Sequence, residues 1–114
     1  MYFRMFTSIC RRSIYAFGKD ATMLKAVEEC NELAKEVGKY LYADWTGWES
    51  EEQKASSKAA ITEEIADVLI CIINLLEILG INKFDVNNAI EKKQVRQKHR
   101  AEEMLQKRGQ DVQS

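Results

Sequence analysis

Hydrophobic and polar residues along this chain recur at the three- and four-residue spacing of α-helices, in four successive stretches. Turn-forming glycines and short polar residues separate these stretches, and they supply the usual stop and start signals of helices. The pattern therefore predicts an all-α protein built as a four-helix bundle. The predicted helices cover residues 2–17, 20–43, 57–79 and 82 onward, with Gly18 and Gly80 as stops and Asp20 and Asn82 as N-caps.

The third stretch, residues 62–79, is apolar on nearly every side and is therefore expected at the centre of the bundle. Glu64, Asp67 and Asn74 nevertheless share one side of this helix, because steps of three and seven residues return to nearly the same direction. Burying neighbouring carboxylates is costly unless a cation or a hydrogen-bond donor compensates them. The pattern therefore predicts a partner for these acids, and Asn74 could bond a ligand or a neighbouring helix.

The predicted second helix has two distinct faces. An acidic face holds Glu29, Glu32 and Glu36, whose like charges repel at three- and four-residue spacing. A helix with a purely structural role would usually interleave lysines among these glutamates. The other face is an apolar stripe, predicted to be the core side, of Met23, Val27, Cys30, Ala34, Val37 and Leu41.

Residues 44–57 read as a linker, because they are polar and contain Gly47. Thr46 and Glu49 have the spacing of a capping box, which predicts a short helical turn there. Trp45 and Trp48 also lie in this stretch, and they either stack on a nucleobase or pin the linker to the bundle or to a subunit interface.

The composition favours one helix-rich domain. The 114 residues are 46% hydrophobic and 31% charged, without proline, and we expect a domain over residues 1–105 followed by a tail over 106–114. A net charge of -1 gives no pull toward nucleic acid or a membrane surface. The three cysteines are an odd number, which favours reduced thiols and a cytoplasmic location. The acids of residues 62–79 argue against a membrane span.

Two acidic pairs are the strongest candidates for chemistry. Glu29-x-x-Glu32 and Glu64-x-x-Asp67 lie on separate predicted helices. Antiparallel packing of these helices would bring four carboxylates together, as an oxygen-only site suited to Mg²⁺ or to Mn²⁺. A di-iron carboxylate centre is not expected, because it needs Glu-x-x-His motifs and the one histidine, His99, follows none.

A basic run in the fourth helix is the second candidate. Three cations and an amide share one face of this helix, and cations beside a magnesium site are what a polyphosphate requires. No glycine-rich phosphate loop is present, so metal ions and side chains must hold any nucleotide. A solvated, charged helix end is the alternative reading. The residues of this basic face are Lys93, Arg96, Gln97 and Arg100.

These motifs, in this order, resemble those of the MazG-like all-α nucleoside triphosphate pyrophosphohydrolases over about residues 18–100. The resemblance implies hydrolysis of (d)NTP to (d)NMP and pyrophosphate by attack of a metal-activated water on the α-phosphorus. It also implies a homodimer or homotetramer and phosphate contacts from the basic face, where Gln97 replaces the asparagine frequent in the family. The metal ligands and catalytic residues that it implies are Glu29, Glu32, Glu64 and Asp67.

A non-enzymatic interaction module is the rival interpretation. In that case the acids and bases form a structural salt-bridge network, and the apolar helix is only an oligomer seam. The rival predicts that Glu64→Ala merely destabilises the protein and that Mg²⁺ has no effect. A nucleic-acid binder is less favoured than either, since acidic stretches oppose the single basic one.

Overall fold

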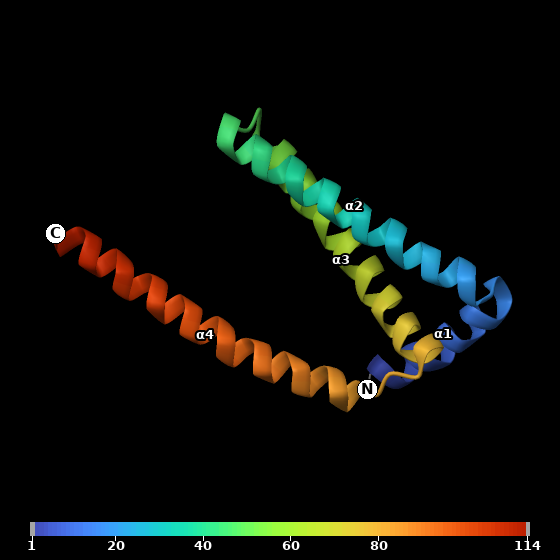
Figure 1. The fold of residues 1–114 in the computed structure, drawn as a ribbon. Coiled ribbons are helices and arrows are strands. Elements are labelled where there is room, and N and C mark those ends of the chain that lie inside the picture. Colours follow the sequence, from blue (N-terminus) through green and yellow to red (C-terminus); the bar gives the residue numbers. More distant parts are fainter. Residues whose placement is uncertain (1, 114) are drawn as a thin grey trace. The chain divides into compact units, whose positions relative to one another are not determined.

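A computed structural model describes residues 2–113, with side chains described for residues 8–109. Four helices with short connections make up this part of the chain, and it contains no strand, which confirms the all-α prediction (Figure 1). The chain divides into two units, Met1–Gly80 and Ile81–Ser114. The helices are α1 (Tyr2–Phe17), α2 (Lys19–Thr46), α3 (Glu51–Leu79) and α4 (Lys83–Gln113).

In the first unit, α2 and α3 form an antiparallel hairpin with a four-residue turn, Gly47 to Ser50. Ser50 is the N-cap of α3, since its hydroxyl accepts the backbone N–H of Gln53 at 3.0 Å. The Gln53 side chain in turn accepts the N–H of Glu49 at 2.9 Å. The predicted linker over residues 44–57 was therefore too long, because this capping pair starts α3 at Glu51.

The predicted capping box of Thr46 and Glu49 was also wrong. The Thr46 hydroxyl donates to the carbonyl of Tyr42 at 2.9 Å, within the last turn of α2. A threonine hydroxyl bonded back to the preceding turn belongs to the helix that is ending and cannot cap the next one.

Glycines separate the other helices as the sequence predicts. Gly18 has a φ of 88° and its N–H donates to Ile14, while Gly80 adopts the left-handed conformation and its N–H donates to Leu76. Asn82 caps α4 by accepting the N–H of Phe84 at 2.8 Å. Asp20 does not cap α2, because Gly18 occupies the cap position and no side chain bonds there. Helix α4 continues to Gln113, through most of the predicted tail.

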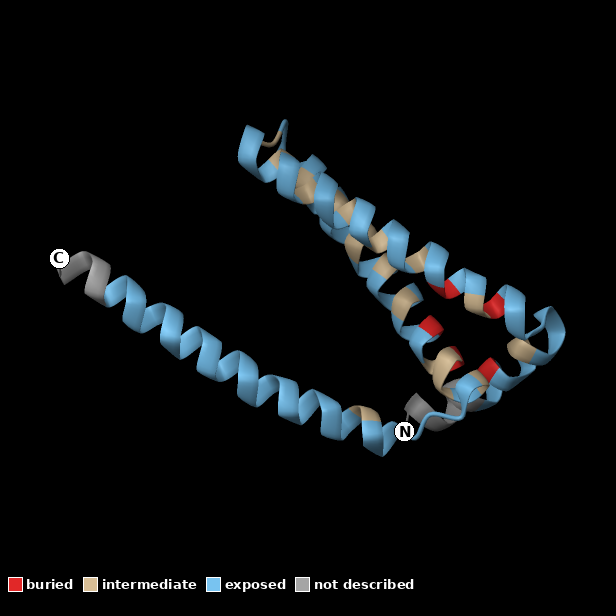
Figure 2. Cartoon of the chain, viewed as in Figure 1, coloured by how far each residue is buried: buried red, intermediate tan, exposed pale blue. Residues whose placement is uncertain are grey.

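The best-covered part of the first unit is the region where α1 meets α2 and α3 (Figure 2). An ion pair joins α1 to α3, with the guanidinium of Arg11 2.6 Å from a carboxylate oxygen of Glu77. The buried residues are Cys10 of α1, Thr22 and Ala26 of α2, and Cys71 and Asn74 of α3.

The face that α2 turns toward α3 differs from the predicted core stripe. Buried and half-buried residues of α2 recur at steps of four and three, and they include two of the glutamates. Apart from Met23, which is half-buried, the predicted stripe is exposed in this unit, with Val27 58%, Val37 45% and Leu41 43% accessible. Within the first unit the stripe is therefore not the core side, because α3 packs on the acidic side of α2. The residues of this interhelix face are Thr22, Ala26, Glu29, Leu33, Glu36, Tyr40 and Ala43.

Helix α3 is likewise only partly covered, although the sequence placed it at the centre of the bundle. Ile65 is 45%, Leu69 55% and Ile72 42% accessible. Within residues 2–113, none of the helices combines the length and the apolar character that crossing a bilayer requires.

Candidate metal centre

Three carboxylates converge where the acidic side of α2 faces α3. Glu29 comes from α2, and Glu64 and Asp67 come from α3, one turn apart. One carboxylate oxygen from each residue lies within 4.8 Å of the others. The antiparallel hairpin therefore brings together three of the four acids that the sequence singles out.

The cluster is partly withdrawn from water and carries excess negative charge. The Glu29 side chain is 12% accessible, and Oε2 of Glu64 is buried without a hydrogen-bond partner. Among the described residues, Lys25 is the base that pairs with the cluster, with its ammonium 2.9 Å from Glu29 Oε1. Three carboxylates and one ammonium leave a formal charge of −2 when all are ionised.

The protonation of the carboxylates follows from these contacts. The hydrogen bond from Lys25 holds the pKa of Glu29 below its ordinary value. Burial raises the pKa of Glu64, and the neighbouring charges of Glu29, Asp67 and Glu32 raise it further. The charged form of Glu64 is therefore disfavoured when no cation is present, because it lies beside two other carboxylates and is partly withdrawn from water.

The donor set fits a hard divalent cation. All three groups are carboxylates, which suit Mg²⁺ and Mn²⁺ better than softer metals that select sulfur or imidazole. The buried Glu64 oxygen, which has no hydrogen-bond partner among the described residues, is a candidate ligand atom for such a cation. A cation of charge +2 also matches the formal excess of the cluster.

Glu32, the fourth predicted ligand, lies outside the convergent trio. Its side chain is exposed on α2, although it is close enough for its charge to raise the pKa of Glu64. Asn74 is 8% accessible, and its Oδ1 has no hydrogen-bond partner among the described residues. The hydrogen bond to a neighbouring helix that the sequence suggested for Asn74 is therefore not made by this oxygen.

The predicted basic face is a real surface feature of α4 in the second unit. Lys93, Arg96, Gln97 and Arg100 together line a hollow of about 380 Å³. All four residues come from one helix at three- and four-residue spacing, as the sequence predicts. Their exposed side chains give α4 a cationic strip suited to an anionic ligand.

The two tryptophans differ in their surroundings. Trp45 is 74% accessible, whereas Trp48 is half-buried and lines a hollow between α2 and α3. The Trp48 indole donates to Asp44 at 3.3 Å, and its ring lies 4.9 Å from that of Tyr40 at an angle of 58°. These contacts fix the indole against the end of α2.

Sequence reasoning missed two features of the site. Lys25 lies four residues before Glu29, and this ion-pair spacing on one helix is a signal that could have revealed it. The hollow beside Trp48 had no comparable signal, because it depends on which small side chains of α2 and α3 face each other.

Comparison with known proteins agrees with this geometry. Residues 17–101 match the family described as MazG nucleotide pyrophosphohydrolase domain. The match covers most of the chain and includes all three residues of the acidic cluster, so the chain belongs to this family. No curated protein and no solved structure gives a significant match.

Proposed function

We propose that this protein is a Mg²⁺-dependent nucleoside triphosphate pyrophosphohydrolase that converts (d)NTP to (d)NMP and pyrophosphate, in nucleotide-pool house-cleaning. The observation that carries the proposal is the convergence of Glu29, Glu64 and Asp67, with one buried oxygen unpartnered, in a chain of this family. A water oxygen bonds to the α-phosphorus, the bond to the bridging oxygen breaks, and pyrophosphate leaves.

The acidic cluster holds the cation in this proposal, with Mn²⁺ as the alternative to Mg²⁺. Glu29, Glu64 and Asp67 would hold the cation, and Glu32, which lies outside this trio on the next turn of α2, would be the fourth ligand. A divalent cation held there would lower the pKa of a bound water and neutralise phosphate oxygens. The four carboxylates orient the site, and none needs to form a covalent intermediate.

Basic side chains bind the phosphates. Lys93, Arg96 and Arg100 neutralise the charge that develops on the leaving pyrophosphate, and the Gln97 amide donates a hydrogen bond to a phosphate oxygen. The shared hollow of these four residues on α4 supports this role. Lys25 adds a cation at the edge of the acidic cluster, where it limits repulsion between the carboxylates and an incoming triphosphate.

We also propose that the protein assembles as a homodimer or homotetramer. Within the first unit, the apolar stripe of α2 and several aliphatic residues of α3 are exposed, and contiguous apolar surface of this kind is typical of protein–protein contacts. Light scattering coupled to size-exclusion chromatography measures this directly. A monomer at micromolar concentration would contradict the proposal.

The rival, a helical interaction module with structural salt bridges, has less support. A structural network would pair its acids with bases. In the acidic cluster, however, the three carboxylates lie close to one another, and of these three only Glu29 forms an ion pair with a described basic side chain. Such an arrangement costs free energy unless a cation binds or a carboxylate takes up a proton.

Product analysis in water labelled with heavy oxygen tests the reaction. Attack at the α-phosphorus places the label in the nucleoside monophosphate and leaves the pyrophosphate unlabelled. Label in pyrophosphate or orthophosphate would show attack at another phosphorus and overturn the proposed bond cleavage. Absence of turnover with every (d)NTP and with both Mg²⁺ and Mn²⁺ would overturn the proposed activity.

A further inference from the structure

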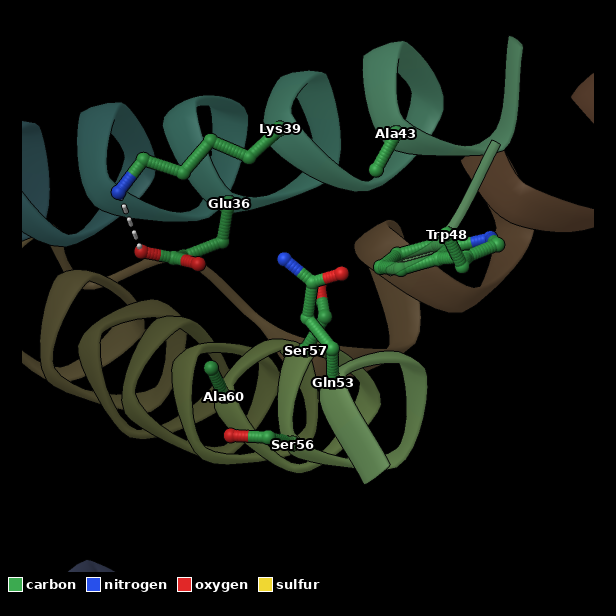
Figure 3. A pocket seen from close by; sticks show the side chains of 8 residues that line it. All are labelled: Glu36, Lys39, Ala43, Trp48, Gln53, Ser56, Ser57 and Ala60. Carbon is green, nitrogen blue, oxygen red and sulfur yellow. Dashed lines mark ion pairs between the residues drawn. The ribbon is translucent and has the colours of Figure 1, made fainter. Parts of the chain in front are cut away.

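A hollow of about 340 Å³ lies between α2 and α3, on the turn side of the acidic cluster (Figure 3). It exists because small side chains face each other at this level of the hairpin and leave the space between the helices unfilled. The half-buried residues among them are Ala43 of α2 and Ser57 and Ala60 of α3, and the exposed Ser56 also lines the hollow.

The hollow and the acidic cluster lie along the same interhelix face. On α2, Glu36 follows Glu29 by seven residues, and on α3, Ser57 precedes Glu64 by seven. A seven-residue step returns to nearly the same side of a helix and advances by about 10 Å. The hollow therefore lies about 10 Å along the interhelix face from the acids, a separation that the sugar and base of a nucleotide whose phosphates bind at the acids can span.

The lining of the hollow suits a flat heteroaromatic ring. Trp48 closes it at the turn end, held by Asp44 and Tyr40, so its indole is positioned before any ligand arrives. Aromatic side chains stack on nucleobases because every base has a π-face. The seryl hydroxyls and the Gln53 amide add hydrogen-bonding groups around the edge of this space.

Gln53 is the residue best placed to contact the edge of such a ring. Its Oε1 accepts the backbone N–H of Glu49, and this hydrogen bond fixes the carboxamide and leaves the amino group to donate to another acceptor. Figure 3 shows the carboxamide between Glu36 and Trp48, within the hollow. Opposite it lies the ion pair of Glu36 and Lys39, at 3.5 Å, which supplies both an acceptor and a donor.

We propose that this hollow holds the nucleobase of the substrate, with Trp48 stacking on the ring and the Gln53 amino group donating to a carbonyl oxygen or ring nitrogen of the base. The proposal rests on the proposed function, which it deepens by assigning the base to one tryptophan of the two. Trp45 does not line the hollow, so it has no part in base binding.

The two tryptophans provide a matched test by fluorescence. Trp45→Phe leaves Trp48 as the only indole, and Trp48→Phe leaves only Trp45, because the chain contains two tryptophans. Each variant is titrated, in the presence of Mg²⁺, with a nucleotide that cannot be cleaved between its α- and β-phosphates and with inorganic tripolyphosphate. We expect the nucleotide to quench Trp48 in the first variant, with no change in the second and no effect of tripolyphosphate on either.

Kinetics give an independent readout. Trp48→Ala should raise KM for the triphosphate about tenfold, which is the usual size of base–aromatic stacking, with little change in kcat. Trp45→Ala should leave both constants unchanged. Ala43→Leu fills the hollow from α2 with a good helix former, and it should raise KM without altering either tryptophan.

The outcomes separate this proposal from the proposed function. Normal turnover with equal KM in both tryptophan variants and in Ala43→Leu would overturn the base pocket and leave the hydrolase standing. Quenching of Trp48 by tripolyphosphate alone would also overturn it. Nucleotide-specific quenching of Trp48 without turnover would support the pocket and count against the hydrolase activity.

Discussion

Removing one carboxylate from the acidic cluster should affect stability in opposite directions with and without a divalent cation. In Glu64→Gln, the amide keeps the shape of the side chain but removes one of three carboxylates whose ligand atoms lie within 4.8 Å of one another. Without a cation, this change relieves repulsion around a buried, unpartnered oxygen. We therefore expect the variant to melt in EDTA at the same temperature as the wild type or higher.

With Mg²⁺ the order should reverse. A cation present at 100 times its Kd adds about 2.7 kcal/mol to the free energy of unfolding when it binds only the folded state. For a domain of this size, that corresponds to a rise in Tm of roughly 10 °C. The wild type should show such a rise on addition of saturating Mg²⁺, and Glu64→Gln should lose most of it.

Thermal melts followed by circular dichroism, in EDTA and in Mg²⁺, measure both effects. Glu52→Gln is the matched control, since it removes an exposed carboxylate from the first turn of the same helix and should keep the Mg²⁺ response. A wild type that does not respond to Mg²⁺, or a Glu64→Gln protein that keeps the full response, would refute the metal site. Strong destabilisation of Glu64→Gln in EDTA would favour the salt-bridge module.

Three further predictions concern pH, the α1–α3 contact and the start of α3. Burial raises the pKa of Glu64 above its ordinary 4.5, so in EDTA the contribution of this group to stability is complete below pH 4.5 and is lost as pH rises through the raised pKa. The rise in Tm that Mg²⁺ produces should grow over the same pH range, because the cation binds the deprotonated carboxylate. Glu64→Gln should remove both pH dependences. Arg11→Ala should cost at most about 1 kcal/mol, because the Arg11 and Glu77 side chains are 67% and 33% accessible, and salt should reduce the difference in denaturant melts; a larger, salt-independent loss would contradict a surface ion pair. Ser50→Ala should cost about 1 kcal/mol by removing the acceptor for the Gln53 N–H, whereas Ser50→Asp should retain stability; an unchanged alanine variant would show that the cap contributes nothing.

The fold class and the acidic centre were accessible from the sequence because both depend on local spacing. Glu64 and Asp67 stand out as acids in a nearly uniformly apolar helix. Gly18 and Gly80 end helices because glycine, which lacks a Cβ, readily adopts a positive φ, and Asn82 begins one by accepting a backbone N–H with its side chain. Such features need no knowledge of which helix packs against which.

The packing face of α2 could not be predicted in the same way. Periodicity shows that Val27, Val37 and Leu41 share a side, but it does not show whether α3 or another surface covers that side. The helix has two usable faces, and the chain packs its acidic face on α3. Because of this packing, three carboxylates converge between α2 and α3, and most of the apolar stripe is exposed within the first unit.

The hollow beside Trp48 depends on register, which the sequence does not encode locally. Moving the start of α3 from Ser57 to Glu51 changes which residues face α2 at the turn end of the hairpin. The capping pair of Ser50 and Gln53 sets this register. The spacing of Thr46 and Glu49 predicted a cap at Thr46 instead, where the hydroxyl bonds back to Tyr42 of α2.

The most direct test of the account is release of pyrophosphate from a panel of (d)NTPs by the wild type, Glu64→Gln and Glu52→Gln, each with Mg²⁺ and with EDTA. We predict equimolar nucleoside monophosphate and pyrophosphate from the wild type and the control in Mg²⁺, and none in EDTA. Glu64→Gln should lose at least about 100-fold in turnover, since even outer-shell partners of metal ligands contribute 10- to 100-fold. Turnover that persists in EDTA or in Glu64→Gln would contradict the central claim that this acidic cluster is the catalytic metal centre.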